Sequence, residues 1–285
     1  MNDPEILDPR RTPARRDLAA TSLEGELAAA RFVEGRKMQV REPALPLRRD
    51  PAGDAPLLTE ALHGEIVTIY DEEEGWAWGQ LDADGYVGFL PAEGLDATVT
   101  APTHRVATLR TFIYPGPDIK LPIMAALSLG AEVCMTHSLG SFAGTAGGFI
   151  WAAHLAPVGS VEPDFVAVAE RFLGVPYLWG GKTSLGLDCS GLVQVSLAAS
   201  GIAAPRDSDM QEREVGNALA VGDGLAGLQR GHLVFWKGHV GIMRDAGTLL
   251  HASGHHMMVV SEPLRTARDR ILAQGYGPPT SARRL

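Results

Sequence analysis

One of the two cysteines, Cys189, follows a glycine-rich stretch and opens an apolar segment. This arrangement constrains the fold of the chain more than any other feature. The stretch from Pro176 to Gly191 reads PYLWGGKTSLGLDCSG. The segment after Cys189 is apolar on nearly every side and ends at Gly201, which predicts a buried helix of about three turns. Unpaired backbone N–H groups and the helix dipole at such a first turn lower the pKa of a thiol. The pattern predicts a cysteine nucleophile, although most free cysteines are simply small buried hydrophobes.

Two histidines further along the chain supply a candidate general base and its partner. The stretch GHVGIMRDAGTLLHASG, which begins at Gly238, predicts two short strands joined by a polar turn. If the hairpin folds about Asp245, His239 and His251 pair directly on one face, with Cβ atoms about 5 Å apart. His239 would then take the thiol proton while His251 orients its ring. A register slip of one residue would move His251 to the opposite face and break this arrangement.

The runs PYLWGG, DCSG, GHVGI and LLHASG, in this order, resemble the NlpC family of papain-like cysteine peptidases, which cut bacterial cell-wall peptides. The 50 residues from Cys189 to His239 and the 12 from His239 to His251 are the spacings expected for that family. The resemblance implies an α+β fold, in which a helix bearing the Cys packs on an antiparallel sheet bearing both His. It assigns the catalytic roles to Cys189, His239 and His251.

The region before this domain has the pattern of small all-β units. Residues 37–98 contain short strands separated by turns such as DEEEG and DADG, which favours a small antiparallel barrel. A fainter copy follows in residues 99–158, where ALSLGAEVCM echoes ALHGEIVTI and GFIWAAHL echoes GFLPAEGL. The pair resembles tandem bacterial SH3-like barrels. We expect them between a flexible extension over residues 1–36, with a short helix from Glu24 to Val33, and a peptidase domain over residues 159–285.

The resemblance also implies which residues contact substrate. Tyr177, Asp188 and Ser190 surround the nucleophile and are expected to line the cleft. In relatives that demand a free amino terminus, an Asp–Ser pair contacts the substrate amine, and Asp207 and Ser208 stand at that place. A carboxylate and a hydroxyl suit a buried ammonium, although an N-cap or a turn explains the same two residues without any substrate.

The first barrel is expected to wall off one end of the pocket, as it does in relatives with amino-terminus specificity. Tyr86, in DGYVG, matches a tyrosine of those relatives. Leu58 falls where an acidic residue is expected, so Glu60 is taken as its substitute. Tyr86 fits a barrel-core aromatic equally well.

Charge and composition exclude other classes of protein. The net charge of −9 argues against nucleic acid or an anionic membrane as the main partner. No apolar run approaches the roughly 18 residues of a membrane span. The amino-terminal stretch lacks the hydrophobic core of a signal peptide, so we expect a cytoplasmic location, with export by an unusual route left open. Cys134, in the apolar run AEVCM, is expected to be a structural strand residue.

No cofactor or metal is implied. The chain has no HExxH and no paired CxxC, and GKTS lacks the preceding glycine of a phosphate-binding loop.

Taken together, these features predict a cysteine peptidase. By resemblance, its substrates are murein tripeptide or related stem peptides, cut between γ-D-glutamate and the diamino acid, with a free L-Ala amine recognised, in cell-wall peptide recycling. An acyltransferase on the same scaffold and a non-catalytic wall-peptide binding module are the alternatives. The sequence does not specify the diamino acid, the oligomeric state or whether the first barrel closes the pocket.

Overall fold

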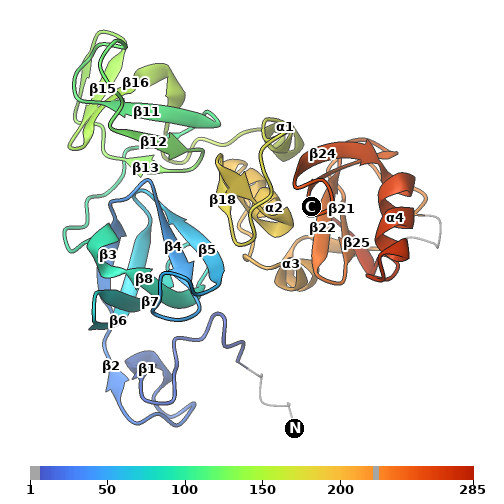
Figure 1. Ribbon diagram of the computed structural model, residues 1–285, viewed down its shortest axis with the longest axis horizontal. Coiled ribbons are helices and arrows are strands. Elements are labelled where there is room, and N and C mark those ends of the chain that lie inside the picture. The colour runs from blue at the N-terminus through green and yellow to red at the C-terminus, as the bar shows by residue number, and fades with distance from the viewer. Residues whose placement is uncertain (1–6, 221–224) are drawn as a thin grey trace. The chain divides into compact units, whose positions relative to one another are not determined.

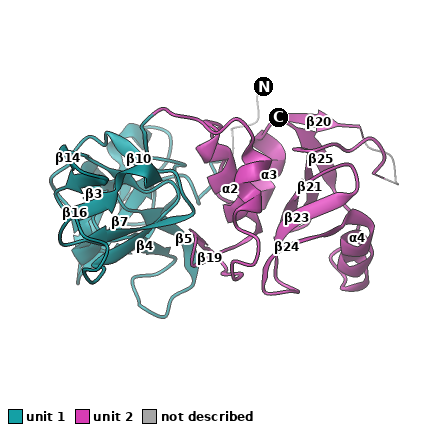
Figure 2. Ribbon diagram, turned by 90° about the horizontal axis from the view of Figure 1, so that it is seen from above, with its two compact units in different colours: residues 1–158 teal, residues 159–285 magenta. Residues whose placement is uncertain are grey.

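The computed structural model describes residues 7–220 and 225–285 and divides into two compact units, residues 1–158 and 159–285 (Figure 2). The first is built from strands, and the second combines helices with an antiparallel sheet (Figure 1). None of the helices in the described ranges is both long and apolar enough to cross a membrane.

A seven-stranded antiparallel sheet, in the order β5-β4-β8-β7-β6-β3-β9, forms the first part of unit 1. Its elements are β3 (Arg36–Val40), β4 (Ala44–Arg48), β5 (Leu57–Leu62), β6 (Ile66–Glu73), β7 (Trp76–Leu81), β8 (Val87–Pro91), the 3₁₀ helix η2 (Ala92–Gly94) and β9 (Leu95–Asp96). Alternate residues of β6 are buried, with Val67 and Ile69 on the core face. This alternation is the signal from which the sequence predicts the strands.

The second part of unit 1 repeats part of this order of elements. Its elements are β10 (His104–Val106), β11 (Arg110–Tyr114), β12 (Ala125–Ser128), β13 (Glu132–Val133), β14 (His137–Leu139), β15 (Phe142–Thr145), β16 (Gly148–Trp151), η3 (Ala152–His154) and β17 (Leu155–Pro157). The strands form sheets in the orders β13-β10-β17 and β12-β11-β16-β15-β14. The succession β16-η3-β17 matches β8-η2-β9, as the echo of GFLPAEGL by GFIWAAHL leads one to expect.

The amino-terminal segment differs from the expected flexible extension. It contains β1 (Ala19–Ala20), η1 (Thr21–Leu23) and β2 (Phe32–Val33), and Leu18 is buried against Trp78 and Val87. The guanidinium of Arg15 stacks over Trp78 and pairs with Asp71 at 2.5 Å. These contacts fix the segment, because they combine apolar burial with a charge-assisted hydrogen bond.

The short helix expected from Glu24 to Val33 is not formed, so that prediction is wrong. Gly25 adopts a φ of 90°, which an α-helix does not accommodate, and Phe32–Val33 extends to pair with β1. Residues 1–6 of the expected extension lie outside the described residues.

Unit 2 confirms the predicted fold class. Its elements are α1 (Phe165–Glu170), β18 (Lys182–Thr183), β19 (Gly186–Leu187), α2 (Cys189–Ala199), α3 (Ser208–Glu214), β20 (Asn217–Leu219), β21 (Leu233–Trp236), β22 (His239–Met243), β23 (Thr248–Ser253), β24 (Met258–Pro263), α4 (Leu264–Ala273) and β25 (Ser281–Arg284). The main sheet has the order β20-β25-β21-β22-β23-β24. Helix α2 packs against β22 and β23, and α4 lies on the other side of the sheet (Figures 1 and 2).

Local chemistry sets the ends of the two helices that lead to the site. Asp164 caps α1, and its carboxylate accepts from the backbone N–H of Val166 at 2.9 Å. Gly201, with a φ of 75°, follows α2 and allows the chain to turn back without side-chain strain. The core of α2 is buried on nearly every face, as its uninterrupted apolar sequence predicts.

Candidate active site

Cys189 is the first residue of α2 and is 6% exposed. The backbone N–H groups of Val240 and Ser190 point to its sulfur, and the Tyr177 side chain lies close enough to interact with it electrostatically. Val240 is the residue after His239, so the strand that carries the predicted base passes directly beside the nucleophile. The predicted position of Cys189 at the head of a buried helix is thus observed.

Burial opposes the thiol ionisation that the helix terminus was expected to favour. Desolvation, followed by the nearby Asp188 carboxylate, raises the pKa of Cys189 to about 12. Desolvation, together with His251 and Arg270, lowers the pKa of His239 to about 3. Both shifts favour a neutral thiol and a neutral imidazole. The helix terminus alone therefore does not determine the ionisation of this thiol.

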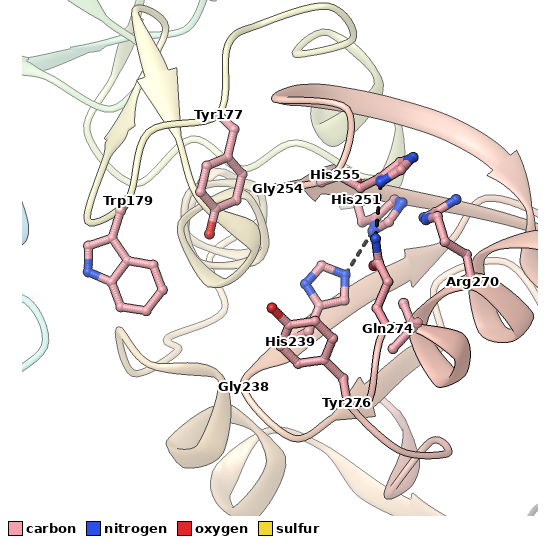
Figure 3. A pocket seen from close by; sticks show the side chains of 12 residues that line it. Tyr177, Trp179, Gly238, His239, His251, Gly254, His255, Arg270, Gln274 and Tyr276 are labelled. Atoms are coloured by element: carbon pink, nitrogen blue, oxygen red, sulfur yellow. Dashed lines mark hydrogen bonds between the residues drawn. The ribbon is translucent and has the colours of Figure 1, made fainter.

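A continuous hydrogen-bonded chain runs from His239 into the protein. His239 Nε2 lies 2.7 Å from His251 Nδ1 (Figure 3), and His251 Nε2 lies 2.9 Å from Glu262 Oε1. The Arg270 guanidinium then holds Glu262 with both terminal nitrogens, each 2.6 Å from a carboxylate oxygen. His251 is 1% exposed, so this chain lies inside the protein, while His239 is half-buried at its outer end.

The two histidines meet through a register different from the predicted one. Strand β22 pairs with β23 so that Ile242 faces Leu250 and Met243 faces Leu249. This register centres the turn one residue later than Asp245, so His239 and His251 are diagonal neighbours and not direct partners. Because the shift moves each cross-strand partner by two residues, both rings stay on one face of the sheet. The predicted contact survives although the predicted pairing is wrong.

The hydrogen-bond partners determine which nitrogen of each ring carries a proton. Two bonds from Arg270 and one from His251 lower the pKa of Glu262 to about 2 against the desolvation that raises it, so this carboxylate only accepts. His251 must donate from Nε2 and, being neutral, accepts at Nδ1. His239 therefore donates from Nε2, which leaves its Nδ1 lone pair available as the base.

A second arginine–carboxylate pair lies beneath the nucleophile. Asp188 accepts from Arg206 at 2.9 and 2.8 Å and from the backbone N–H of Gly180 and Gly191, each at 2.8 Å. The Ser190 hydroxyl lies between them, 3.2 Å from Asp188 and 2.9 Å from Arg206. This cluster fastens the glycine-rich approach to the first turn of α2.

Steric crowding explains the glycine at position 191 in DCSG. A Cβ atom at Gly191 would lie 2.3 Å from the carbonyl oxygen of Gly181, so any side chain would push α2 away from the approach loop. Asp188 and Ser190 were expected to contact substrate. Both are buried and form hydrogen bonds with Arg206, and their contact with substrate stays a prediction.

The remaining predicted binding residues fall at separate places. Asp207 precedes α3 and makes no capping hydrogen bond with its side chain, and Ser208 is the first residue of that helix. Tyr86 is 3% exposed and immediately precedes β8, and Glu60 lies on β5 opposite Pro46. Both of these belong to unit 1, and their part in the site stays a prediction.

A cavity of about 450 Å³ opens beside the histidines. Tyr177, Trp179, His239, Gln274 and Tyr276 line it, and Figure 3 shows the hydroxyl of Tyr177 directed into it. Trp179 and Tyr276 are 69% and 59% exposed, so the rim is aromatic and accessible.

The sequence reasoning missed Trp179, Tyr276, Glu262 and Arg270. Trp179 is visible in PYLWGG, whereas Glu262 and Arg270 are single charges in an ordinary polar stretch. Cys134 lies just after β13, and both cysteines are free.

Two family models and several known proteins match this chain. The sequence profile of the NlpC/P60 family matches residues 174–272, and that of the bacterial dipeptidyl-peptidase SH3 domain matches residues 47–95. The gamma-D-glutamyl-L-lysine dipeptidyl-peptidase of Bacillus cereus (strain ATCC 10987 / NRS 248) is 27% identical over 243 residues, which cover 74% of this chain and 71% of that protein. Its counterpart in Bacillus subtilis (strain 168) is 28% identical over 224 residues, covering 70% of this chain and 73% of that protein.

The crystal structure of an NlpC/P60 family protein from Bacillus cereus ATCC 10987 has the same fold, with a TM-score of 0.71 and 22% identity over 87% of this chain and 99% of that chain. A helix-borne cysteine beside two sheet-borne histidines defines a cysteine peptidase of the papain-like kind. Residues 174–272 thus form an NlpC/P60 domain, which follows a bacterial SH3 domain over residues 47–95.

Proposed function

We propose that this enzyme is a γ-D-glutamyl-L-diamino acid endopeptidase that removes L-Ala-γ-D-Glu from murein stem peptides. The observation that carries the proposal is the extent of the similarity to the two Bacillus dipeptidyl-peptidases. It spans 243 and 224 residues, whereas unit 2 has only 127, so it includes much of unit 1 as well as the catalytic unit. The hydrogen-bonded histidines beside Cys189 supply the chemistry such a reaction needs.

The reaction follows from the protonation states of the site. As the sulfur of Cys189 attacks the γ-glutamyl carbonyl, its proton passes to Nδ1 of His239. The backbone N–H groups near the sulfur are candidates to hold the oxyanion. The His239 imidazolium then gives its proton to the leaving amine of the diamino acid. Water, activated by the same ring, hydrolyses the thioester and regenerates the thiol.

We further propose that Asp207 and Ser208 recognise the free amine of L-Ala. Both residues stand at the start of α3, Asp207 at its N-cap position and Ser208 as its first residue. An ammonium that leaves water needs an acceptor of opposite charge. Tyr86 and Glu60 of the SH3 domain are proposed to complete this end of the site.

A free-amine requirement restricts the enzyme to peptides already released from the glycan, because the L-Ala amine of intact murein is acylated. We therefore propose a role in the recycling of wall peptides inside the cell.

The test compares L-Ala-γ-D-Glu-L-Lys and its diaminopimelate analogue with the same peptides acetylated at L-Ala. We expect release of the dipeptide from the free peptides and a loss of about two orders of magnitude or more in kcat/KM on acetylation, as for a buried charged hydrogen bond. Equal rates would overturn the amine recognition. Aminolysis products in the presence of an added amine would instead support an acyltransferase.

A further inference from the structure

We propose that Glu262, held by Arg270, is a positioning residue that extends the Cys–His–His set and fixes His239 as a base. Glu262 does not touch the nucleophile. It acts on His239 through His251, whose ring lies between them with contacts of 2.7 and 2.9 Å. The inference rests on the proposed peptidase function, because it assigns His239 the task of moving the thiol proton.

Three neighbouring strands and one helix hold the components of this chain. His239 lies on β22, His251 on β23 and Glu262 on β24, and Arg270 reaches Glu262 from α4. His251 pairs with Val260, so Glu262 is two residues further along the adjacent strand and points to the same face as His251. The sheet thus places the two rings and the carboxylate in one diagonal row.

The two hydrogen bonds from Arg270 leave the Glu262 side chain little freedom. Each of its oxygens accepts from one terminal nitrogen of Arg270 at 2.6 Å, and Oε1 also accepts from His251. The side chains of Glu262 and Arg270 are 12% and 17% exposed. A two-point arginine contact fixes the plane of a carboxylate. With the carboxylate plane fixed, Oε1 accepts from His251 Nε2 in one direction only, and this orients the His251 ring.

Orientation of the carboxylate selects the protonation of both rings. An acceptor at His251 Nε2 requires a proton there, which makes Nδ1 an acceptor for His239 Nε2–H. With that proton fixed, Nδ1 of His239 is free to receive the thiol proton. If Glu262 were a neutral amide, it could donate to His251 instead, and the chain of donors and acceptors could reverse.

The carboxylate also offsets the positive charge that forms during the reaction. The charged or titratable groups that act on the two rings are Glu262, Arg270 and His256, besides the rings themselves. Of these, Glu262 alone stabilises an imidazolium, while Arg270 opposes it. Glu262 thus favours the charged His239 that must exist between attack and protonation of the leaving amine.

Alkylation of Cys189 by iodoacetamide tests this role without any peptide substrate. The rate is followed against pH by mass spectrometry of the peptide that contains Cys189, which separates it from Cys134. In Glu262→Gln we expect the rate at neutral pH to fall by about tenfold to a hundredfold. This is a part of the roughly 100- to 10,000-fold contribution of a general base, because His239 itself remains. The two rates should converge at alkaline pH, where hydroxide replaces His239 as the base. An unchanged rate and pH profile would overturn the proposal.

Two variants separate positioning from simple filling of a polar site. Glu262→Gln combined with Arg270→Gln keeps a paired, neutral couple at the same place, so we expect it to remain slow at neutral pH. Recovery of the wild-type rate would show that Glu262 only neutralises Arg270 and would overturn the proposal. Glu170→Gln is the matched control. Glu170 also pairs with arginines, Arg230 at 3.2 Å and Arg244 at 2.7 Å, but it is not part of the hydrogen-bonded chain that contains the histidines. The alkylation rate of this variant should equal that of wild type.

The same readout separates failure of this inference from failure of the proposed substrate. If murein peptides are not cut but Glu262→Gln still slows alkylation, the positioning role stands and the substrate assignment falls. Nitrogen chemical shifts of the histidine rings give a second measure. We expect wild-type His251 to carry its proton on Nε2, and observation of an Nδ1 proton there would contradict the proposal.

Discussion

Unit 2 contains two arginine–carboxylate pairs close to the site, and they do different work. Arg206 and Asp188 are 1% and 10% exposed in their side chains, and backbone N–H groups take up the rest of the carboxylate. Arg270 and Glu262 are 17% and 12% exposed, and the carboxylate also accepts from a histidine ring. The first pair binds backbone groups of the approach loop and of α2. The second pair binds a histidine ring and so acts electrostatically on both rings.

This difference shows that the partners of an ion pair, rather than its distance, reveal its role. Both pairs have two short contacts between guanidinium and carboxylate. Asp188 fixes the loop and helix that position Cys189, so its loss should appear first as lost stability. Glu262 fixes a ring, so its loss should appear first in the rate and in its pH dependence.

The largest effect is expected from Arg206→Met, which breaks the pair with Asp188. It leaves the Asp188 carboxylate buried without its counter-charge, at a cost of about 3 to 5 kcal/mol in the free energy of unfolding. Urea unfolding measures this loss. Arg213→Met is the control, because its i,i+4 contact with Asp209 is exposed and worth about 0.5 kcal/mol or less. Equal losses in the two variants would contradict the comparison.

A smaller loss of stability, with a visible kinetic effect, is expected from Arg270→Gln. We expect about 1 to 3 kcal/mol, because a partly exposed carboxylate loses charged hydrogen bonds but keeps His251. Arg270 lowers the pKa of both rings, so its removal should shift the acid limb of the kcat/KM profile to higher pH while kcat falls. An acid limb that moves to lower pH would contradict the claim that Arg270 lowers the pKa of the two histidines.

Acid unfolding sharpens the comparison further. The pKa of Glu262 is lowered from its ordinary 4.5 to about 2, so its contribution to stability is fully present above 4.5 and is lost as the pH falls towards 2. Glu262→Gln should flatten the dependence of stability on pH in this window. Chemical unfolding at a series of acidic pH values gives the measurement, and a slope equal to that of wild type would refute the assignment.

A small effect is expected from Glu170→Gln, which removes the carboxylate shared by two arginines. The Glu170 side chain is 25% exposed and contacts Arg230 and Arg244, which are about 40% exposed. Solvent screens such pairs, so the free energy of unfolding should fall by about 1 kcal/mol or less. Peptidase activity should not change, and a drop in kcat would mean that the effect of Glu262 is not specific to its place.

The sequence singles out the three residues proposed as catalytic because each has a local signal. Cys189 opens a helix after a glycine-rich approach, and the two histidines stand on the strands of one hairpin. The exact register was not predictable, since the polar turn accommodates a centre at either Asp245 or Ala246. Both rings nevertheless stay on one face, because moving the turn centre by one residue moves each cross-strand partner by two, an even number.

The charged partners could not be found in the same way. Glu262 and Arg270 are eight residues apart on different elements, and neither stands in a motif with a fixed spacing. Their role depends on the diagonal position of Glu262 beside His251, which only the tertiary structure defines. The thiol pKa was also misjudged, because the helix terminus is visible in the sequence but the desolvation of Cys189 is not.

Trapping the acyl-enzyme tests the central claim most directly. The enzyme is mixed with L-Ala-γ-D-Glu-L-Lys, quenched in acid within one turnover, digested and examined by mass spectrometry. The account predicts an L-Ala-γ-D-Glu thioester on Cys189, none on Cys134, and almost none in His239→Ala. Release of the dipeptide at the normal rate with Cys189 replaced by Ala, or an adduct that forms equally well without His239, would contradict it.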